Sequence, residues 1–209
     1  MNIVTMPVGV VGTNAYILHN DGATEAVLID PGCEATHIQQ ELEKRGLTLV
    51  AILLTHGHFD HIGAVDALRE ALGVDVYSSE LEAELAADTY LNGCKPMRRP
   101  EVVCTVTKYI EGGQMLNIAG LEIHAISTPG HTHGHLCFHL PAHSTLFSGD
   151  CLFKGSYGRH DLPTSDFDQL KASLFRLFEL PDDTDVYPGH GSATTIKYEK
   201  KHNPINRGR

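Results

Sequence analysis

The sequence lacks the features that place a protein in a membrane or outside the cell. No segment approaches the ~18 consecutive apolar residues that a membrane-spanning helix needs. The first residues, MNIVTMPVGVVGTNAYIL, have no basic flank followed by a long apolar core. We therefore expect neither a membrane span nor a secretory signal.

Cysteines and basic residues are also few. The five cysteines are scattered and form no C-x-x-C pair, which argues against a disulfide framework and fits a reducing cytoplasm. They are Cys33, Cys94, Cys104, Cys137 and Cys151. Lys and Arg total 16 against 26 Asp and Glu, so the formal net charge is -10. A negative surface disfavours nucleic acid and anionic membranes as general partners. We expect a cytoplasmic protein.

Histidine is the residue in excess, with 14 copies in 209 residues. Hydrophobic residues make up 42% and charged residues 20%, which is ordinary for a globular protein. No linker or low-complexity segment interrupts the chain. We therefore predict one domain over residues 1–209.

Short apolar segments alternate with helical patterns along the chain. Runs of apolar residues bounded by turn residues predict strands, and apolar residues three and four apart predict helices. The predicted strands are 3–8, 14–18, 25–29, 50–54, 74–77, 122–127, 136–140, 145–147 and 184–187, with a hairpin over 116–122. The predicted helices are 34–45, 62–72, 79–88 and 166–178. This order predicts an α/β protein with two packed sheets and helices outside them.

Four of the predicted strands end in polar turns. Strand 50–54 continues into HGHFDH, strand 122–127 into TPGH, strand 145–147 into SGD and strand 184–187 into PGH. Side chains just past strand ends can converge on one edge of a pair of sheets while the strands hold them rigidly. These turns are the candidate site.

The segment THGHFDH, from Thr55, has the densest cluster of histidines. Alternate side chains of an extended turn share a face, so His56 and His58 can hold one ion while Asp60 and His61 hold another. Imidazole and carboxylate ligands without thiolate suit zinc, and also iron or manganese. The alternative is a solvated polar loop.

Residues at the other three strand ends complete a ligand set. Alone, each is an ordinary turn residue; together they divide the ligands into two groups. We predict one site made by His56, His58 and His131, a second made by Asp60, His61 and His190, and Asp150 bridging both. Each ion would keep an open position for a shared water, which a catalytic site requires.

The pattern H-x-H-x-D-H followed by a distant His, Asp and His resembles the metallo-β-lactamase superfamily over nearly the whole chain. The resemblance implies a four-layer αββα sandwich with a binuclear site at one edge. It supports the ligand assignment position by position. The turn Asp30-Pro31-Gly32 also matches the family, in which Asp30 would support the ligands; a simple turn role is the alternative.

Several branches of the family fit less well. The best-known β-lactamases carry a cysteine where Asp150 stands, and flavo-diiron proteins carry a carboxylate where His58 stands. Nucleases of the family usually add an exosite or a second domain.

The glyoxalase II group fits better. The stretch GDCLF, continuing to GRHDLP, and the C-terminal TI, Glu199 and Asn203-Pro204 are similar to this group and to its short bacterial relatives. Only 19 residues follow His190, so we expect the short form of the group, without the C-terminal helical domain of the long enzymes. In those enzymes a basic residue after G-D-x-L-F helps to hold the glutathione thioester, and Arg159 matches that position. Tyr157 is a candidate for the same pocket, and surface roles are the alternatives for both.

The resemblance implies hydrolysis of S-lactoylglutathione, or of a similar hydroxyacyl thioester, by a hydroxide that bridges two divalent ions. Zinc is the expected metal, with iron or manganese as alternatives. Asp60 would orient the hydroxide and is the expected catalytic residue. A glutathione conjugate is the expected small-molecule partner, and the oligomeric state is left open.

Other activities stay open on the same ligands. A persulfide dioxygenase would hold a single iron with His56, His131 and Asp150. A lactonase, or a metal-binding domain without turnover, is also compatible with the residues.

Of the other polar residues near the motifs, we expect His133 and His135 to be loop or supporting residues and Cys151 to be buried. His160 lies beside Arg159 and is either a surface residue or a substrate contact.

Overall fold

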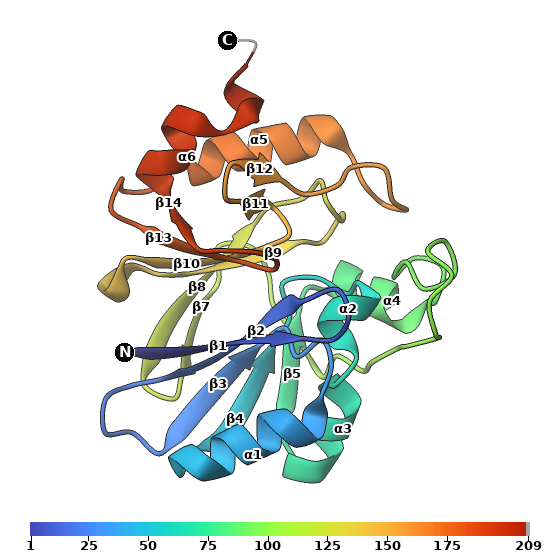
Figure 1. Ribbon diagram of the computed structural model, residues 1–209, viewed down its shortest axis with the longest axis vertical. Helices are drawn as coiled ribbons and strands as arrows, with labels where there is room; N and C mark the ends of the chain where they lie inside the picture. The colour runs from blue at the N-terminus through green and yellow to red at the C-terminus, as the bar shows by residue number, and fades with distance from the viewer. Residues whose placement is uncertain (208–209) are drawn as a thin grey trace.

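The computed structural model describes residues 1–207, so residues 208–209 of the predicted domain lie outside the description. Two six-stranded sheets pack against each other (Figure 1). The first sheet contains, in spatial order, β1 (Asn2–Val8), β2 (Thr13–His19), β3 (Glu25–Ile29), β4 (Thr48–Leu53), β5 (Asp75–Ser78) and β6 (Lys108–Tyr109). The second contains β14 (Thr194–Thr195), β13 (Asp185–Pro188), β10 (Thr145–Gly149), β9 (Leu136–Leu140), β8 (Leu121–Ser127) and β7 (Met115–Ile118). A small hairpin pairs β11 (Leu152–Phe153) with β12 (Ser156–Tyr157).

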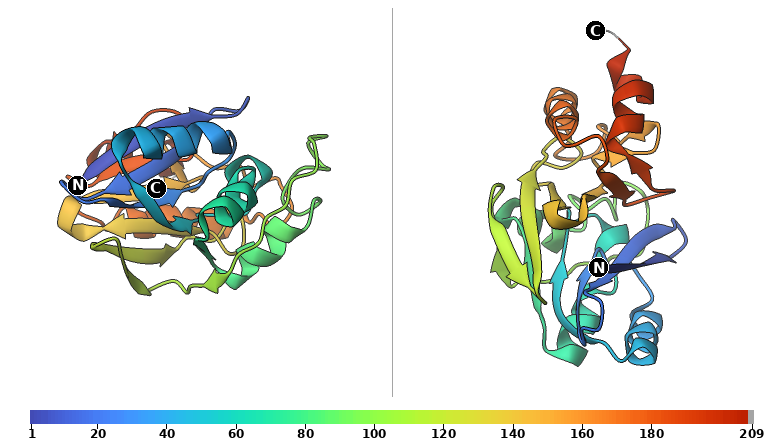
Figure 2. Two further views of the ribbon diagram at one scale, coloured as in Figure 1. Left: turned by 90° about the horizontal axis from the view of Figure 1, so that it is seen from below. Right: turned by 90° about the vertical axis from the view of Figure 1, so that its left-hand side faces the viewer.

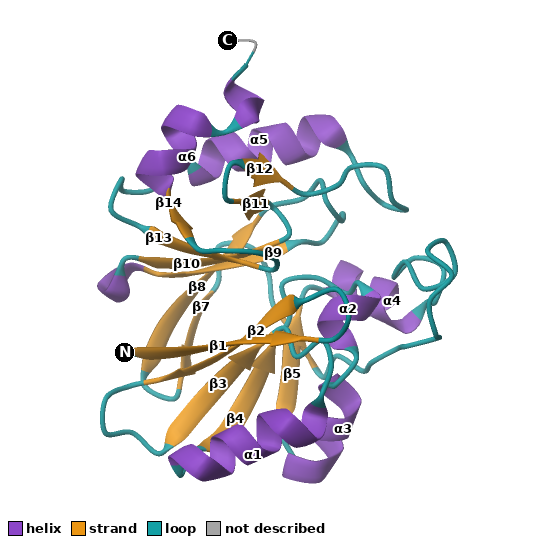
Figure 3. Ribbon diagram, viewed as in Figure 1, coloured by secondary structure: helices purple, strands orange, loops and turns teal. Residues whose placement is uncertain are grey.

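Helices form the two outer layers, which completes the αββα order that the sequence predicted (Figure 3). On the side of the first sheet lie α1 (Ala35–Arg45) and α3 (Val65–Leu72), and on the side of the second lie α5 (Phe167–Leu177) and α6 (Ile196–His202). The right-hand view of Figure 2 shows the same layers from the side, with α5 and α6 at one end and α1 at the other. The short helices α2 (Phe59–Ile62) and α4 (Glu80–Ala87) lie beside the site, and the 3-10 turns are η1 (Pro141–His143) and η2 (Pro204–Asn206).

Three apolar clusters fill the three interfaces between the layers. The middle cluster joins Leu53 of the first sheet to Phe138 and Phe147 of the second. The outer clusters place Ile38 of α1 against the first sheet and Leu174 of α5 against the second. From Ala26 to Ile29, strand β3 is apolar because it is buried on both faces, with alternate residues in the middle and outer clusters.

Strand direction brings the four polar turns to one edge. In the second sheet, β8 and β10 are both antiparallel to β9, and β10 is parallel to β13, so β8, β10 and β13 run the same way and end at the same edge. In the first sheet, β4 is parallel to β3 and β5 and leads into THGHFDH. The predicted convergence of strand ends is therefore present.

The helix predicted over 62–72 is wrong at its start. The chain forms α2 inside the histidine motif and then α3, with a break at Gly63. The carbonyl of Pro31 accepts the Ala64 N–H at 2.9 Å, so that amide is unavailable to a continuous helix. A Cβ on Gly63 would lie 2.4 Å from the Gly32 carbonyl oxygen, so the close approach of the two segments requires glycine. Local periodicity could not reveal this contact.

The other predicted helices and strands are present, with ends shifted by at most two residues. The end predicted for the helix 34–45 is confirmed, since α1 ends at Arg45 and Gly46 caps it with a φ of 67°. The sequence did not predict the short strands β6, β11, β12 and β14 or helix α6. None of the helices within residues 1–207 has the length and apolar character needed to span a membrane. All five cysteines are free thiols, and Cys33 is the exposed one.

Candidate metal centre

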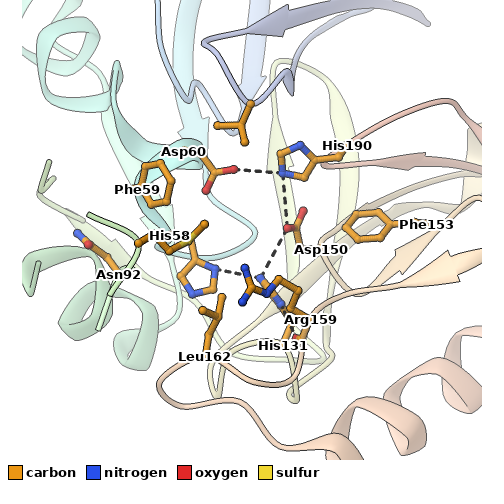
Figure 4. Close-up of a pocket in the computed structure, with 12 residues that line it drawn as sticks. His58, Phe59, Asp60, Asn92, His131, Asp150, Phe153, Arg159, Leu162 and His190 are labelled. Atoms are coloured by element: carbon orange, nitrogen blue, oxygen red, sulfur yellow. Dashed lines mark hydrogen bonds and ion pairs between the residues drawn. The ribbon is translucent and has the colours of Figure 1, made fainter. Parts of the chain in front are cut away.

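The seven predicted ligands lie together at the edge where the strands end. Figure 4 shows those that line the cavity: His58, Asp60, His131, Asp150 and His190. His56 and His58 come from the turn after β4, and Asp60 and His61 come from α2. His131, Asp150 and His190 follow β8, β10 and β13. The structure therefore brings together every ligand that the sequence predicted, from both sheets.

The first donor group is His56, His58 and His131, whose ligand atoms lie within 4.8 Å of one another. His58 Nδ1 and His131 Nε2 are 2.9 Å apart. All three side chains are buried. This is the membership that the sequence predicted for one site.

The second donor group is Asp60, His61 and His190, again within 4.8 Å. His190 Nε2 lies 3.1 Å from Asp60 Oδ2, and His61 Nε2 lies 3.8 Å from the same oxygen. His190 is partly exposed, so this group is the more open of the two. It matches the predicted second site.

Asp150 lies between the two groups. Its Oδ2 is 3.6 Å from both His131 Nε2 and His190 Nε2, and its Oδ1 is 3.4 Å from His61 Nε2. One carboxylate therefore contacts members of both groups, as a bridging ligand would.

Several donor atoms at the centre are left without a partner. Within residues 1–207, His56 Nε2, His61 Nε2 and Asp150 Oδ1 are buried and make no hydrogen bond. Buried polar atoms without partners are rare because each costs about 1–3 kcal/mol. Coordination of cations would satisfy such atoms, and imidazole with carboxylate suits divalent metals. The residues present fit a divalent metal centre.

Asp30 forms hydrogen bonds with residues of this centre. Its carboxylate accepts hydrogen bonds from the Thr55 N–H at 2.8 Å, the Thr55 hydroxyl at 2.6 Å and His61 Nδ1 at 3.0 Å. Asp30 lies close enough to His56 and His61 to be a ligand itself, but both its oxygens are already occupied. Of the two roles considered for Asp30, support of the ligands agrees with these contacts.

Hydrogen bonds also determine which histidine nitrogens face the centre. Because a carboxylate or carbonyl can only accept, His61 Nδ1 carries its proton toward Asp30, and His131 Nδ1 donates to the Arg159 carbonyl at 2.8 Å. The Thr55 hydroxyl gives its proton to Asp30, so it accepts from His56 Nδ1 at 3.0 Å. In the neutral form of each of these three rings, Nε2 is the nitrogen that keeps a lone pair for a metal.

The charges of the cluster are strongly coupled. Burial acts to raise the pKa of Asp60, but His61 and His190 outweigh it and lower that pKa to about 2. The pKa of Asp150 is lowered in the same way, mainly by His61. Burial acts to lower the pKa of His61, but Asp150 and Asp60 hold it well above its usual value. Burial and the neighbouring histidines lower the pKa of His56 well below its usual value. Both carboxylates therefore stay ionised, and a metal would displace the protons on His61 and His190.

Side chains of strand β2 form hydrogen bonds with the second donor group and with the turn that carries His190. The Thr13 hydroxyl donates to Asp60 Oδ2 at 3.0 Å. The Tyr16 hydroxyl and the Asn14 side-chain amide both donate to the Pro188 carbonyl, at 2.6 Å and 3.0 Å, and so hold the turn that carries His190. The sequence analysis did not single out these residues. The available signal was the buried polar side chains within an apolar strand.

The donor groups face a cavity of about 290 Å³. Its apolar wall is formed by Val11, Phe59, Met97, Phe153 and Leu162, and Asn92 and Arg159 also line it. An adjoining cavity of about 210 Å³ shares Val11, Phe59 and Asp60 with the first. The site can therefore admit an organic substrate alongside the donor atoms.

The two predicted substrate residues lie in different places. Arg159 lines the cavity, and its guanidinium forms two hydrogen bonds with Asp161, at 2.9 Å and 3.1 Å. Tyr157 lies outside this cavity, in a neighbouring surface hollow that Arg159 also lines. Its ring lies beside His160 and Phe167.

The remaining histidines and the nearby thiol have supporting or surface positions. The buried His135 accepts the Asp150 N–H at Nε2, 3.2 Å away, and its Nδ1 donates to the Thr128 hydroxyl at 2.8 Å. His133 is a surface residue whose ring contacts the Leu81 carbonyl. Cys151 is buried, as expected.

The C-terminal motif has a structural role. The buried carboxylate of Glu199 accepts hydrogen bonds from the Gly155 N–H, the Thr194 hydroxyl and the Asn203 side chain. These contacts tie the β11–β12 hairpin, next to Arg159, to α6. The motif therefore anchors the cavity wall.

Comparison with known proteins agrees with this geometry. The sequence profile of the metallo-beta-lactamase superfamily matches residues 8–190. The chain belongs to this superfamily. The match covers strands β2 to β13 and all seven predicted ligands.

Curated relatives match over nearly their whole length. The probable metallo-hydrolase YqgX of Bacillus subtilis is 40% identical over 205 residues, covering 97% of this chain and 96% of the relative. The hydroxyacylglutathione hydrolase GloC of Haemophilus influenzae is 34% identical over 208 residues, covering 98% of each.

Solved structures share the fold closely. The B3 metallo-beta-lactamase BLEG-1 superposes with a TM-score of 0.93 at 38% identity, covering 99% of this chain and 100% of that chain. TTHA1623, in a di-iron-bound form, gives 0.86 at 39% identity, with coverage of 97% and 99%. ETHE1 from Myxococcus xanthus gives 0.81 at 31% identity, with coverage of 98% and 84%.

Proposed function

We propose that this protein is a metal-dependent thioester hydrolase of the glyoxalase II type. Its substrate would be S-lactoylglutathione or a similar hydroxyacyl thioester, met in the cytoplasm. The observation that carries the proposal is two complete donor groups, joined by one carboxylate, at the base of a cavity. The GloC relative, named as a hydroxyacylglutathione hydrolase, supports the choice of substrate.

The ligands would divide as predicted from the sequence. His56, His58 and His131 would hold one ion, Asp60, His61 and His190 the other, and Asp150 would contact both. Divalent ions held there supply Lewis acidity and lower the pKa of bound water. We propose zinc; the di-iron form of TTHA1623 keeps iron as an alternative, and manganese also suits these ligands.

The residues of the chain would orient the reactants. Asp60 is ionised and lines the cavity, so it can accept a hydrogen bond from the attacking water and aim it at the thioester carbonyl. The apolar wall, including Phe59 and Phe153, would exclude other water. Arg159 would bind a carboxylate of the thiol part, exchanging its pairing with Asp161 for the substrate, and Tyr157 would extend this contact outside the cavity.

Two other activities have specific support. A persulfide dioxygenase would need one iron on His56, His131 and Asp150, and His131 lies beside Asp150. The complete second donor group favours the hydrolase. Hydrolysis of a β-lactam is the other candidate, because BLEG-1 is named as a B3 metallo-beta-lactamase.

One comparison of substrates tests the proposal. The protein loaded with Zn²⁺ and the protein loaded with Fe²⁺ are each given S-lactoylglutathione, glutathione persulfide with oxygen uptake recorded, and a β-lactam. We expect thioester hydrolysis with two ions per chain, and its loss in His56→Ala and Asp150→Ala. The control is His133→Ala, a partly exposed histidine on the loop that carries His131, which should hydrolyse normally. No thioester turnover in fully metallated protein would reject the proposal.

A further inference from the structure

A buried carboxylate that is not one of the predicted ligands contacts the loops that carry them. Glu82 is in the first turn of α4 and is completely buried. Ser79 begins this helix and accepts the Glu82 N–H on its hydroxyl at 3.2 Å. The S-x-x-E spacing is that of a capping box, in which the glutamate would bend back to the backbone of the first residue.

The Glu82 side chain instead points to two ligand loops. Its Oε2 accepts the Gly57 N–H at 2.8 Å. Its Oε1 accepts the Thr132 hydroxyl at 2.6 Å and the Gly134 N–H at 2.8 Å. Burial raises the pKa of Glu82, and the three hydrogen bonds act against this because all three partners donate and so stabilise the ionised carboxylate.

The loops that Glu82 joins belong to different sheets. Gly57 separates His56 from His58 and follows a strand of the first sheet; Thr132 follows His131, after a strand of the second sheet. These three histidines are the first donor group. The carboxylate therefore ties together both loops that supply this group.

The first of these loops is seated directly on α4. A Cβ on Gly57 would lie 2.8 Å from both the Ala86 nitrogen and the Glu82 carbonyl oxygen, so only glycine fits between the two histidines. On the second loop, the Ser79 hydroxyl donates to the Gly134 carbonyl at 2.8 Å. Helix α4 therefore acts as a common base for the two loops, and Glu82 is its polar contact with both.

We propose that Glu82 is a positioning residue for the first donor group. Its hydrogen bonds would set the separation and orientation of His58 and His131 without adding a ligand. The inference rests on the proposed metal site but not on the identity of the substrate. It assigns a role in metal binding to a residue of the supporting helix.

The decisive variant is Glu82→Gln. Glutamine keeps the shape but has one acceptor oxygen, so its amide group must face either the Gly57 N–H or the Thr132 and Gly134 donors. We expect weaker binding at the first donor group, by about 10–100-fold, as for other groups that orient metal ligands. Titration of metal-free protein with Co²⁺ measures the affinity, and the visible Co²⁺ spectrum reports ligand geometry.

Two further comparisons separate positioning from general stability. Glu84→Gln removes the same charge from an exposed position of the same helix and should leave both readouts unchanged. Thr132→Val removes one donor and should weaken Co²⁺ binding in the same direction by a smaller factor. Thr132→Ser restores the hydroxyl and should recover wild-type binding. The threonine pair keeps the test valid if Glu82→Gln does not fold.

The outcomes are distinct. Wild-type Co²⁺ affinity and spectrum in folded Glu82→Gln, or in Thr132→Val, would overturn the inference. Wild-type protein that binds Co²⁺ but hydrolyses no thioester when loaded with metal would reject the proposed function and leave this test intact. Wild-type protein that binds no Co²⁺ would reject both.

Discussion

Asp30→Asn tests whether hydrogen bonding controls which nitrogen of His61 faces the metal. Asp30 is buried, and its two oxygens accept three hydrogen bonds, two from Thr55 and one from His61 Nδ1. The φ of Asp30 is 49°, in the left-handed region that asparagine tolerates well. The substitution therefore changes hydrogen bonding without adding backbone strain.

Asparagine cannot reproduce the three bonds. If its NH₂ replaces Oδ1, it meets the Thr55 N–H, donor against donor. If it replaces Oδ2, it meets His61 Nδ1, which must then accept, so the His61 proton moves to Nε2. Protonated Nε2 has no lone pair for a metal. The second arrangement is favoured, because His61 can shift its proton whereas the Thr55 N–H cannot become an acceptor. It removes a ligand from the second donor group.

The size of the effect follows from the bonds lost. A hydrogen bond to a charged group contributes about 1.5–3 kcal/mol, so losing one and weakening the others should lower the unfolding free energy by about 2–3 kcal/mol. For a chain of this length that corresponds to a decrease in Tm of about 4–12 °C. Affinity at the second donor group should fall by about 10–100-fold, as for other groups that orient metal ligands.

The assay is calorimetric titration of metal-free protein with Zn²⁺. We expect the wild type to bind two ions, and Asp30→Asn to keep one strong site at His56, His58 and His131. Imidazole ¹⁵N NMR would show the proton of His61 moved to Nε2. Asp183→Asn, at an exposed turn, is the control for loss of a carboxylate. Two ions bound with unchanged affinity, and His61 still protonated at Nδ1, would refute the reasoning.

Three further predictions concern residues around the centre. Tyr16→Phe removes the hydroxyl that donates to Pro188 at 2.6 Å; because Asn14 still donates to that carbonyl, urea unfolding should show a loss of about 1 kcal/mol, and a loss above 3 kcal/mol would contradict this account. Burial lowers the pKa of His135 to about 3 in the folded chain, against about 6.5 in the unfolded chain. Below about pH 6.5 the unfolded chain therefore binds a proton at His135 that the folded chain does not bind. His135 should therefore destabilise the metal-free protein progressively as pH falls from about 6.5 toward 3, and the stability difference between wild type and His135→Gln should shift against the wild type over that range; a pH-independent difference would disprove it. In Glu199→Gln the side-chain NH₂ group faces at least one hydrogen-bond donor, so stability should fall by about 1–3 kcal/mol. KM should rise, because the β11–β12 hairpin is held less firmly. Unchanged stability in chemical denaturation would rule this out.

Much of the architecture could be predicted because its signals are local. The strand 25–29 is a short apolar run bounded by turn residues, and α5 has an apolar stripe at helical spacing; both are present at or near the predicted ends. The break at Gly63 could not be predicted, because it depends on the Pro31 carbonyl, which lies far away along the chain. The short strands β11, β12 and β14 escaped prediction because two residues are too few to show a period.

The candidate site likewise has residues whose roles can be predicted from local sequence and residues whose roles cannot. The donors of THGHFDH are evident from residue type and spacing alone. The supporting roles of Thr13 and Glu82 are not, because a threonine in a strand and a glutamate in a capping-box position are ordinary in sequence. The Arg159 carbonyl holds His131 through backbone, which residue identity cannot reveal.

By itself, the sequence determined the chemistry of the centre: imidazole and carboxylate donors, without thiolate, each placed just after a strand. That information is local, since it depends on side-chain type and on spacing along a turn. Tertiary structure alone decided how close the donors lie, which nitrogen of each histidine faces inward, and what shape of cavity lies in front of them. These properties depend on contacts between distant residues, such as Asp30 with His61 and Tyr16 with Pro188, which exist only when both sheets have packed.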